Sequence, residues 1–274
     1  MTLDISKYLR KLPHIWCAGC GNGIVVGAML RGLEQLGIDQ TQVAVISGIG
    51  CSGRAGNYLN LCGFQPTHGR ALAFATGVKL GNPNLKVIVL AGDGDSLSIG
   101  GNHFIHACRR NIDLTMLVFN NGAYGMTGGQ HAPTTPGGFK TTTTPYGNVE
   151  PNFDTAELAR VSGATYVARS SIYHVQQLIS YISRGISHRG FAVVEAMSTC
   201  PTQFGRMNKL GGPVEMMKSL AQNAVPVKDA AKMAPIELAG KFITGELHVN
   251  KETPEYTERV QQVIAMAQQR REKA

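Results

Sequence analysis

The chain has 274 residues, of which 43% are hydrophobic and 33 are glycine, a composition typical of a compact protein with many tight turns. No apolar run is long enough to span a membrane, and the N-terminal segment lacks the apolar core of a signal peptide. We therefore expect a cytoplasmic protein with reduced cysteines. The formal net charge of +8 comes from scattered Lys and Arg residues. This pattern disfavours a nucleic-acid surface and fits either attraction of an acidic partner or substrate, or solubility alone.

Helical and strand-like patterns alternate through most of the chain. In chain order they predict a helix over 23–36, a strand over 42–47, a helix over about 70–80, a strand over 86–91, a helix over 99–110, a strand over 114–119, a long loop over 122–154, a helix over 155–161, a strand over 164–168, a helix over 172–187 and a strand over 191–196. This alternation predicts an α/β fold with helices on both faces of a parallel sheet.

Two polar motifs follow neighbouring strands of this predicted sheet. Gly92-Asp93-Gly94-Asp95 ends the strand over 86–91, and Asn120-Asn121 ends the strand over 114–119. A strand, a returning helix and a parallel strand bring both motifs to the same carboxyl edge, where open α/β sheets bind ligands. A carboxylate and an amide oxygen suit Mg²⁺, and the glycines let the backbone approach a phosphate. The alternative is a glycine turn with a helix-capping Asp95 and a loop-forming asparagine pair.

From residue 202 onward the alternation stops. A polar loop over 205–213 is followed by predicted helices over 214–222, 229–242 and 254–271, and by no further strand. We therefore divide the chain into a domain over 1–201 and a helical C-terminal extension over 202–274. Apolar residues on one face of the last helix predict packing on its own domain or on another subunit, with a solvent-facing helix as the alternative; they are Val260, Val263, Ile264 and Ala267.

The six cysteines differ in their predicted positions. Four fall in loops or at strand ends, where they are able to form one four-thiolate shell: Cys17, Cys20, Cys51 and Cys200. Spacing alone favours an iron-sulfur cluster and a zinc ion equally. Cys108 lies in a helical run and is expected in the core, and Cys62 is assigned to neither group.

Several motifs in combination resemble a known family. The GDG and NN pair resembles the thiamine diphosphate motif. Together with CxGCG near the start, GxGCS, THGRA, NNxxYGMTGGQ and a late CPT, it resembles the β subunit of the 2-oxoacid:ferredoxin oxidoreductases from Trp16 to about Gly212. The segment from Cys200 to Lys218 looks most like members that act on 2-oxoglutarate. Some archaeal relatives carry a lysine where this chain has Gly128, so substrate contacts are not transferred from them.

The resemblance implies the thiamine diphosphate-binding fold and a set of site residues. Mg²⁺ would be held by Asp93, Asn121 and the backbone carbonyl of Ala123, and a 4Fe-4S cluster by the four cysteines at loop and strand ends. Thr127 matches a hydroxyl donor to the diphosphate. His68 is assigned to the diphosphate, with a surface or capping role as the alternative. The other residues assigned to cofactor binding are Ser52, Gly92, Gly94, Asp95 and Tyr124.

The implied reaction is the coenzyme A-dependent oxidative decarboxylation of 2-oxoglutarate to succinyl-CoA and CO₂, or its reverse, with electrons passed singly through the cluster to ferredoxin. Pyruvate or a branched-chain 2-oxoacid is the alternative substrate, and a non-catalytic iron-sulfur or zinc scaffold is the alternative function. The sequence assigns neither the direction of the reaction nor the subunit stoichiometry.

One catalytic group is missing from the predicted site. Thiamine enzymes normally supply a glutamate to the aminopyrimidine ring from a separate domain. The carboxylates before Asp93 lie away from strand ends, and Glu195 is expected to be a paired structural carboxylate; the earlier ones are Asp4, Glu34 and Asp39. We therefore expect an α subunit to supply this glutamate and to bury the loop over 122–154. Small ferredoxin-like γ and δ subunits are further candidate partners.

Overall fold

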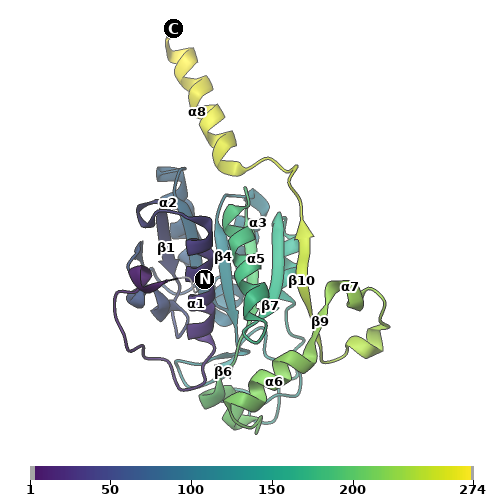
Figure 1. The fold of residues 1–274 in the computed structure, drawn as a ribbon. Helices are drawn as coiled ribbons and strands as arrows, with labels where there is room; N and C mark the ends of the chain where they lie inside the picture. The colour runs from purple at the N-terminus through teal and green to yellow at the C-terminus, as the bar shows by residue number, and fades with distance from the viewer. Residues whose placement is uncertain (1–3, 273–274) are drawn as a thin grey trace.

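The computed structural model describes residues 4–272, in which one mixed sheet forms the centre of the molecule (Figure 1). Its strand order is β2-β1-β3-β4-β8-β7-β10-β9, and all neighbouring pairs are parallel except β10 with β7. The strands are β1 Val43–Ser47, β2 Cys62–Phe64, β3 Lys86–Gly92, β4 Thr115–Asn120, β7 Tyr166–Ser171, β8 Ala192–Met197, β9 Ala224–Pro226 and β10 Phe242–Val249.

Helices cover both faces of the sheet, which confirms the expected α/β fold. Helices α1 (Asn22–Leu36) and α5 (Val175–Ser187) pack together on one face. The other face is covered by α2 (Ala71–Gly81), α3 (Gly101–Arg110) and α4 (Thr155–Val161). Side chains alternate along each central strand, so that Val89 and Val118 face α2 to α4 whereas Leu90 and Leu117 face α1 and α5. Two apolar cores therefore fix the strands whose ends carry the site.

The expectation that no strand follows residue 202 is wrong. β10 pairs antiparallel with β7, and β9 pairs with β10, so the C-terminal extension adds two strands to the sheet. The helix predicted over 229–242 is reduced to α7 (Val227–Ala230) and a short 3₁₀ turn (Pro235–Leu238). Pro235 and Gly240 interrupt helical hydrogen bonding there, and the open edge of β7 supplies partners to the β10 backbone that local periodicity does not reveal.

The short edge strand β2 was also missed by sequence reasoning. Its three residues are all exposed, so they carry no alternation of buried and exposed positions. Helix α6 (Pro213–Asn223) lies near the expected position, and α3 is preceded by a π-helical turn over Asp95–Ile99 instead of starting at Ile99.

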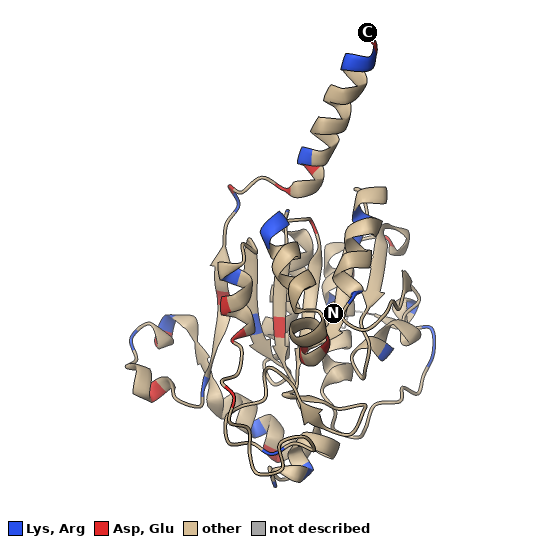
Figure 2. Ribbon diagram, turned by 180° about the vertical axis from the view of Figure 1, so that it is seen from behind, with Lys and Arg blue, Asp and Glu red and all other residues tan. Residues whose placement is uncertain are grey.

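The last helix, α8 (Tyr256–Glu272), projects away from the amino edge of the sheet (Figure 1). Its apolar side chains do not pack on the domain, since Val263 is 58% and Ile264 42% exposed. Packing on its own domain is therefore wrong, and contact with another subunit stays a prediction. Among residues 4–272 no helix is long and apolar enough to cross a membrane. Figure 2 shows Lys and Arg spread over many elements, in agreement with the scattered charge of the sequence.

Candidate active site at the carboxyl edge

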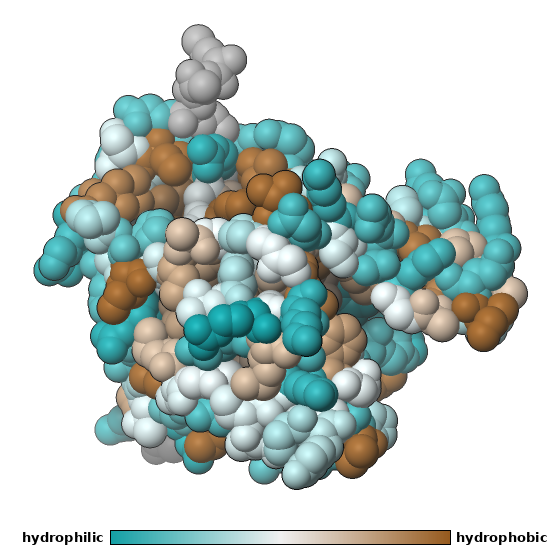
Figure 3. Space-filling model, turned by 90° about the horizontal axis from the view of Figure 1, so that it is seen from below, coloured by the Kyte–Doolittle hydropathy of each residue, from teal (hydrophilic) through white to brown (hydrophobic). Residues whose placement is uncertain are grey.

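A cleft of about 100 Å³ opens at the carboxyl ends of β1, β3 and β4. Its wall contains all ten residues that the sequence assigns to cofactor binding, namely Ser52, His68, Gly92, Asp93, Gly94, Asp95, Asn121, Ala123, Tyr124 and Thr127. Figure 3 views the molecule from this side, where polar and apolar side chains are mixed and form no single apolar patch. The parallel β3-α3-β4 unit is the reason that residues so far apart in sequence meet there.

Asp93 is the buried carboxylate of this cleft, with only 2% of its surface exposed. Its Oδ2 accepts hydrogen bonds from the Gly122 amide at 2.8 Å and from the Thr134 hydroxyl at 2.5 Å. Burial raises the pKa of Asp93 to about 6, although these hydrogen bonds oppose the rise. None of the ion pairs found within residues 4–272 involves Asp93. A buried carboxylate without a basic partner is chemically suited to a divalent cation.

Thr134 is a site residue that sequence reasoning missed. It lies in the long loop after β4 and is 5% exposed, yet its hydroxyl reaches Asp93 across 41 positions of the chain. The sequence carries no local signal for this contact, because a hydroxyl without a local partner finds one wherever the folded chain brings an acceptor within reach.

The two glycines of the GDGD motif are required by close contacts. A Cβ on Gly94 would lie 2.5 Å from the ring of Tyr124, and one on Gly92 would lie 3.0 Å from Oγ of Ser52. The Tyr124 hydroxyl donates to the Gly94 carbonyl at 2.9 Å, which holds the ring over this turn. A side chain on Gly94 would therefore displace the Tyr124 ring from this turn, and both glycines line the cleft.

Asp95 does not cap the following helix, so the capping alternative is wrong, and its assignment to cofactor binding stays a prediction. Its carboxylate accepts hydrogen bonds from the amides of Ile49 at 3.1 Å and Gly69 at 2.7 Å, and lies against Nδ1 of His68. Asp95 thus ties the loop after β1 to the turn before α2. His68 is held at the cleft wall by the same contact.

The four cysteines predicted to share a shell come together beside the cleft. Burial is the main cause that raises the pKa of the Cys20 thiol to about 11, and the neighbouring Cys200, Cys51 and Cys17 contribute to this rise. A Cβ on Gly125 would lie 3.3 Å from the Cys200 sulfur and 3.6 Å from the Cys51 sulfur. Within residues 4–272, no three His, Cys, Asp or Glu side chains are close enough to share a single metal ion.

The other two cysteines lie elsewhere. Cys108 is fully buried in the core between α3 and the sheet, as expected, and burial raises the pKa of its thiol. Cys62 is exposed on the edge strand β2. Neither is placed to complete the shell.

A small hairpin connects the cleft to the cysteines. Its strands are β5 (Ala123–Tyr124) and β6 (Gln130–His131), and the turn between them carries Gly125 and Thr127. The Thr127 hydroxyl donates to Oε1 of Gln130 at 2.6 Å. One side of the hairpin therefore lines the cleft, and its turn contacts the thiols.

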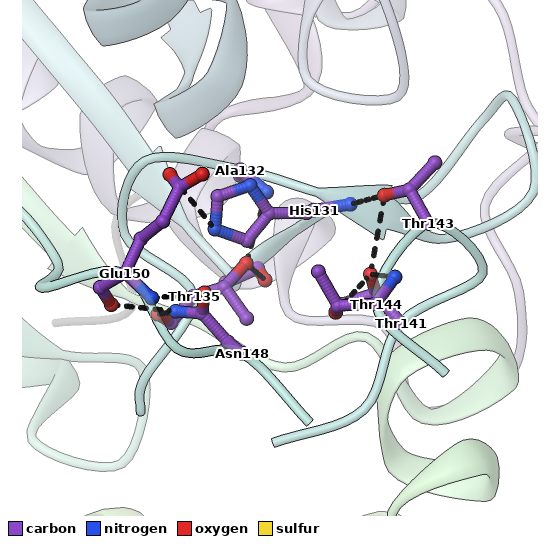
Figure 4. A network of polar contacts seen from close by, with 9 residues as sticks. His131, Ala132, Thr135, Thr141, Thr143, Thr144, Asn148 and Glu150 are labelled. Carbon is purple, nitrogen blue, oxygen red and sulfur yellow. Dashed lines mark hydrogen bonds and ion pairs between the residues drawn. The ribbon is translucent and has the colours of Figure 1, made fainter. Parts of the chain in front are cut away.

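The rest of the long loop is held by its own polar contacts (Figure 4). The His131 amide donates to the Thr143 hydroxyl at 2.9 Å, and the Asn148 side chain donates to the Thr135 carbonyl at 2.8 Å. Asn208, from the segment after Cys200, exchanges two hydrogen bonds with the backbone of Lys140. This part of the loop is thus held in place by its own hydrogen bonds and by contacts to the segment that follows the last cysteine.

Residues 40–196 match the family described as "Thiamine pyrophosphate enzyme, C-terminal TPP binding domain". The 2-oxoglutarate synthase subunit KorB of Methanothermobacter thermautotrophicus is 51% identical over 256 residues, which cover 93% of this chain and 89% of that protein. KorB of Methanocaldococcus jannaschii is 48% identical over 260 residues, which cover 94% and 96%. The chain belongs to the KorB family of 2-oxoacid:ferredoxin oxidoreductase β subunits, which confirms the resemblance seen in its motifs.

A solved structure agrees with this assignment. The 2-oxoglutarate:ferredoxin oxidoreductase from Magnetococcus marinus, determined with 2-oxoglutarate, coenzyme A and succinyl-CoA bound, superposes with a TM-score of 0.86. The sequence identity is 31%, and the match covers 97% of this chain and 91% of that one.

The raised pKa of Asp93 predicts a pH limit for the Mg²⁺ binding that the sequence-based prediction assigns to this carboxylate. Protons compete with Mg²⁺ for the carboxylate, so the affinity should be constant above about pH 6 and fall about tenfold per pH unit below it. Titration of Mg²⁺-dependent thiamine diphosphate binding by calorimetry, between about pH 5 and pH 8, checks this. The Asp93→Asn variant has no titratable group at this position. It should therefore bind weakly and vary less with pH than the parent, since only titration of the diphosphate remains, and a parent-like pH profile in this variant would assign the limit to another group.

Proposed function

We propose that this chain is the β subunit of a 2-oxoglutarate:ferredoxin oxidoreductase and binds thiamine diphosphate, Mg²⁺ and a 4Fe-4S cluster. The observation that carries the proposal is the β5-β6 hairpin, where Ala123 and Thr127 line the cleft while a Cβ on Gly125 would touch the thiols of Cys51 and Cys200. When bound, thiamine diphosphate supplies the nucleophilic carbon and electron sink for decarboxylation, and the cluster supplies one-electron transfer.

The residues of the cleft fit the proposed roles. Asp93 offers a charged oxygen, and Asn121 offers an amide oxygen that accepts from the Ala123 amide at 3.2 Å in the absence of a metal. These two oxygens, with the Ala123 carbonyl, leave the remaining Mg²⁺ positions to phosphate oxygens and water. Thr127 and His68 lie on the wall beside the glycine turn, where a diphosphate would be held.

The arrangement of the thiols favours a cluster over a zinc ion. Zinc–sulfur bonds of about 2.3 Å bring four thiolates within about 4 Å of one another. Among the described residues no three such ligands are close enough to hold a single ion. The thiols are still near enough to one another that Cys17, Cys51 and Cys200 raise the pKa of Cys20. A cluster binds each thiolate to a different iron and so tolerates the wider spacing.

The substrate assignment rests on the relatives. The proteins that match most of the chain at about half identity are named 2-oxoglutarate synthase subunits, and the solved relative holds 2-oxoglutarate and coenzyme A. We therefore extend 2-oxoglutarate, coenzyme A and ferredoxin to this chain. The segment after Cys200 is clamped to the active-site loop through Asn208, so it is placed to affect which 2-oxoacid is accepted.

A second subunit is part of the proposal because the cleft lacks a free carboxylate for the aminopyrimidine ring. Its two carboxylates are Asp93, proposed as the metal ligand, and Asp95, which is committed to the β1 loop. Glu195 is 1% exposed and paired with Arg169, as expected of a structural carboxylate. The earlier carboxylates are absent from the cleft wall; they are Asp4, Glu34 and Asp39.

The test compares the isolated chain with its complex with an α subunit. Both are reconstituted with Mg²⁺, thiamine diphosphate and the cluster, and coenzyme A-dependent viologen reduction is measured with 2-oxoglutarate, pyruvate and a branched-chain 2-oxoacid. We expect turnover only in the complex, and fastest with 2-oxoglutarate. A preference for pyruvate would refute the substrate, and full turnover by the isolated chain would refute the need for an α subunit.

A further inference from the structure

The first asparagine of the Asn120-Asn121 pair lies behind the cleft and is 8% exposed. Its Nδ2 donates to Oε1 of Glu195 at 2.7 Å, and its Oδ1 accepts from the Gly122 amide at 3.2 Å. The same Gly122 amide donates to Asp93 at 2.8 Å. One amide group therefore stands between the buried Glu195 and the turn that begins the active-site loop.

Glu195 decides which way the Asn120 amide faces. An ionised carboxylate only accepts hydrogen bonds, so the Asn120 NH₂ must face Glu195 and the Asn120 oxygen must face the Gly122 N–H. The other oxygen of Glu195 accepts from Nε of Arg169 at 2.5 Å, and Arg169 also contacts the carboxylate of Asp154. The Glu195 carboxylate is therefore shared between an ion pair with Arg169 and a hydrogen bond from Asn120.

The turn over 121–123 carries two of the proposed metal oxygens, those of Asn121 and Ala123. The backbone N–H of Gly122, at its centre, is shared between two acceptors, the carboxylate of Asp93 and the side-chain oxygen of Asn120. We propose that Glu195 and Asn120 are positioning residues that set this turn for metal binding; the inference rests on the Mg²⁺ site of the proposed function. A buried ion pair is weak evidence for a stabilising role, so the Glu195–Arg169 pair is not explained by stability alone. Positioning of the Asn120 amide gives the Glu195 carboxylate a function.

The Glu195→Gln variant separates positioning from simple packing. Arg169 donates only, so it takes the glutamine oxygen, and the glutamine NH₂ then faces Asn120. The Asn120 amide must turn over, which places its own NH₂ against the Gly122 N–H and removes one anchor of the turn. Loss of an outer-shell contact of this kind typically weakens metal affinity by about 10- to 100-fold.

The experiment measures the apparent Kd of Mg²⁺ at fixed thiamine diphosphate, in the cluster-containing complex, with thermal unfolding of each variant alongside. Glu195→Gln and Asn120→Ala should each raise the Kd by roughly 10- to 100-fold. In the double variant Glu195→Gln should add nothing, because no amide remains to turn over. Asp154→Asn is the matched control, because it also converts a carboxylate that pairs with Arg169 into an amide. Asparagine is still an N-cap residue for α4, and the Kd should be unchanged.

The outcomes separate this inference from the proposed function. A parental Kd in a folded Glu195→Gln or Asn120→Ala variant overturns the positioning role, and so do additive effects in the double variant. Asn120→Ala keeps the Glu195–Arg169 pair, so it decides the matter if Glu195→Gln does not fold. If the parent binds thiamine diphosphate equally well without Mg²⁺, the proposed metal site itself fails, and the positioning role fails with it.

Discussion

Replacing Asp93 with alanine should abolish Mg²⁺-dependent binding of thiamine diphosphate. The carboxylate is the charged oxygen ligand proposed for the metal, so its loss should cost more than the roughly 10- to 100-fold that follows loss of an outer contact. Asp93→Asn keeps an acceptor for Gly122 and Thr134 and should lie between the parent and Asp93→Ala. Calorimetric titration of the purified complex, followed by cofactor content after gel filtration, measures both.

The loss should not come from unfolding. The pKa of Asp93 in the fold, about 6, lies above its unfolded value, so the ionised carboxylate destabilises the metal-free fold at neutral pH. The difference corresponds to about 3 kcal/mol, and the destabilisation is relieved as the pH falls below about 6. The metal-free alanine variant loses this destabilisation but also loses the acceptor of Gly122 and Thr134, so it should unfold at a temperature close to that of the parent. Asp229→Ala, an exposed carboxylate on α7, controls for the change in charge. Stoichiometric cofactor in Asp93→Ala would show that the ligand is wrongly assigned.

Replacing Cys200 with alanine should remove the cluster or convert it to a three-iron form. Cys200 lies against Gly125 beside Cys51, and neither remaining cysteine is placed to substitute, since Cys108 is in the core and Cys62 is on the edge strand β2. Iron and sulfide analysis, visible absorption and electron paramagnetic resonance of anaerobically purified protein measure the change. Most of the broad visible absorption should be lost.

Cys62→Ala is the matched control for this experiment. It removes an exposed thiol from the same chain and should keep the parental iron content and spectrum. Equal iron in Cys200→Ala and the parent would refute the four-cysteine shell. A colourless parent loaded with zinc would instead remove the electron path from the proposed function.

The position of the cofactor motif was determined by the sequence alone. Apolar runs of strand length that end at Gly92 and at Asn120, separated by a helix, leave a right-handed parallel crossover as the only common connection, and this brings Asp93 and Asn121 to one edge. The same reasoning placed Cys51 at the end of β1. Recurring residue types at these strand ends also identified the family, because the chemistry requires particular side chains at particular points of the fold.

The tertiary structure decided what depends on contacts between distant segments. Thr134 donates a hydrogen bond to Asp93, and Asp95 binds the loop after β1 instead of capping a helix. β10 pairs with the edge of β7, a contact that the local sequence of β10 does not predict. None of these has a periodic or local signal. Each forms because a buried donor, acceptor or strand edge must be satisfied by whatever the folded chain brings within reach. The orientation of Asn120 is set in this way by Glu195, 75 positions later in the chain.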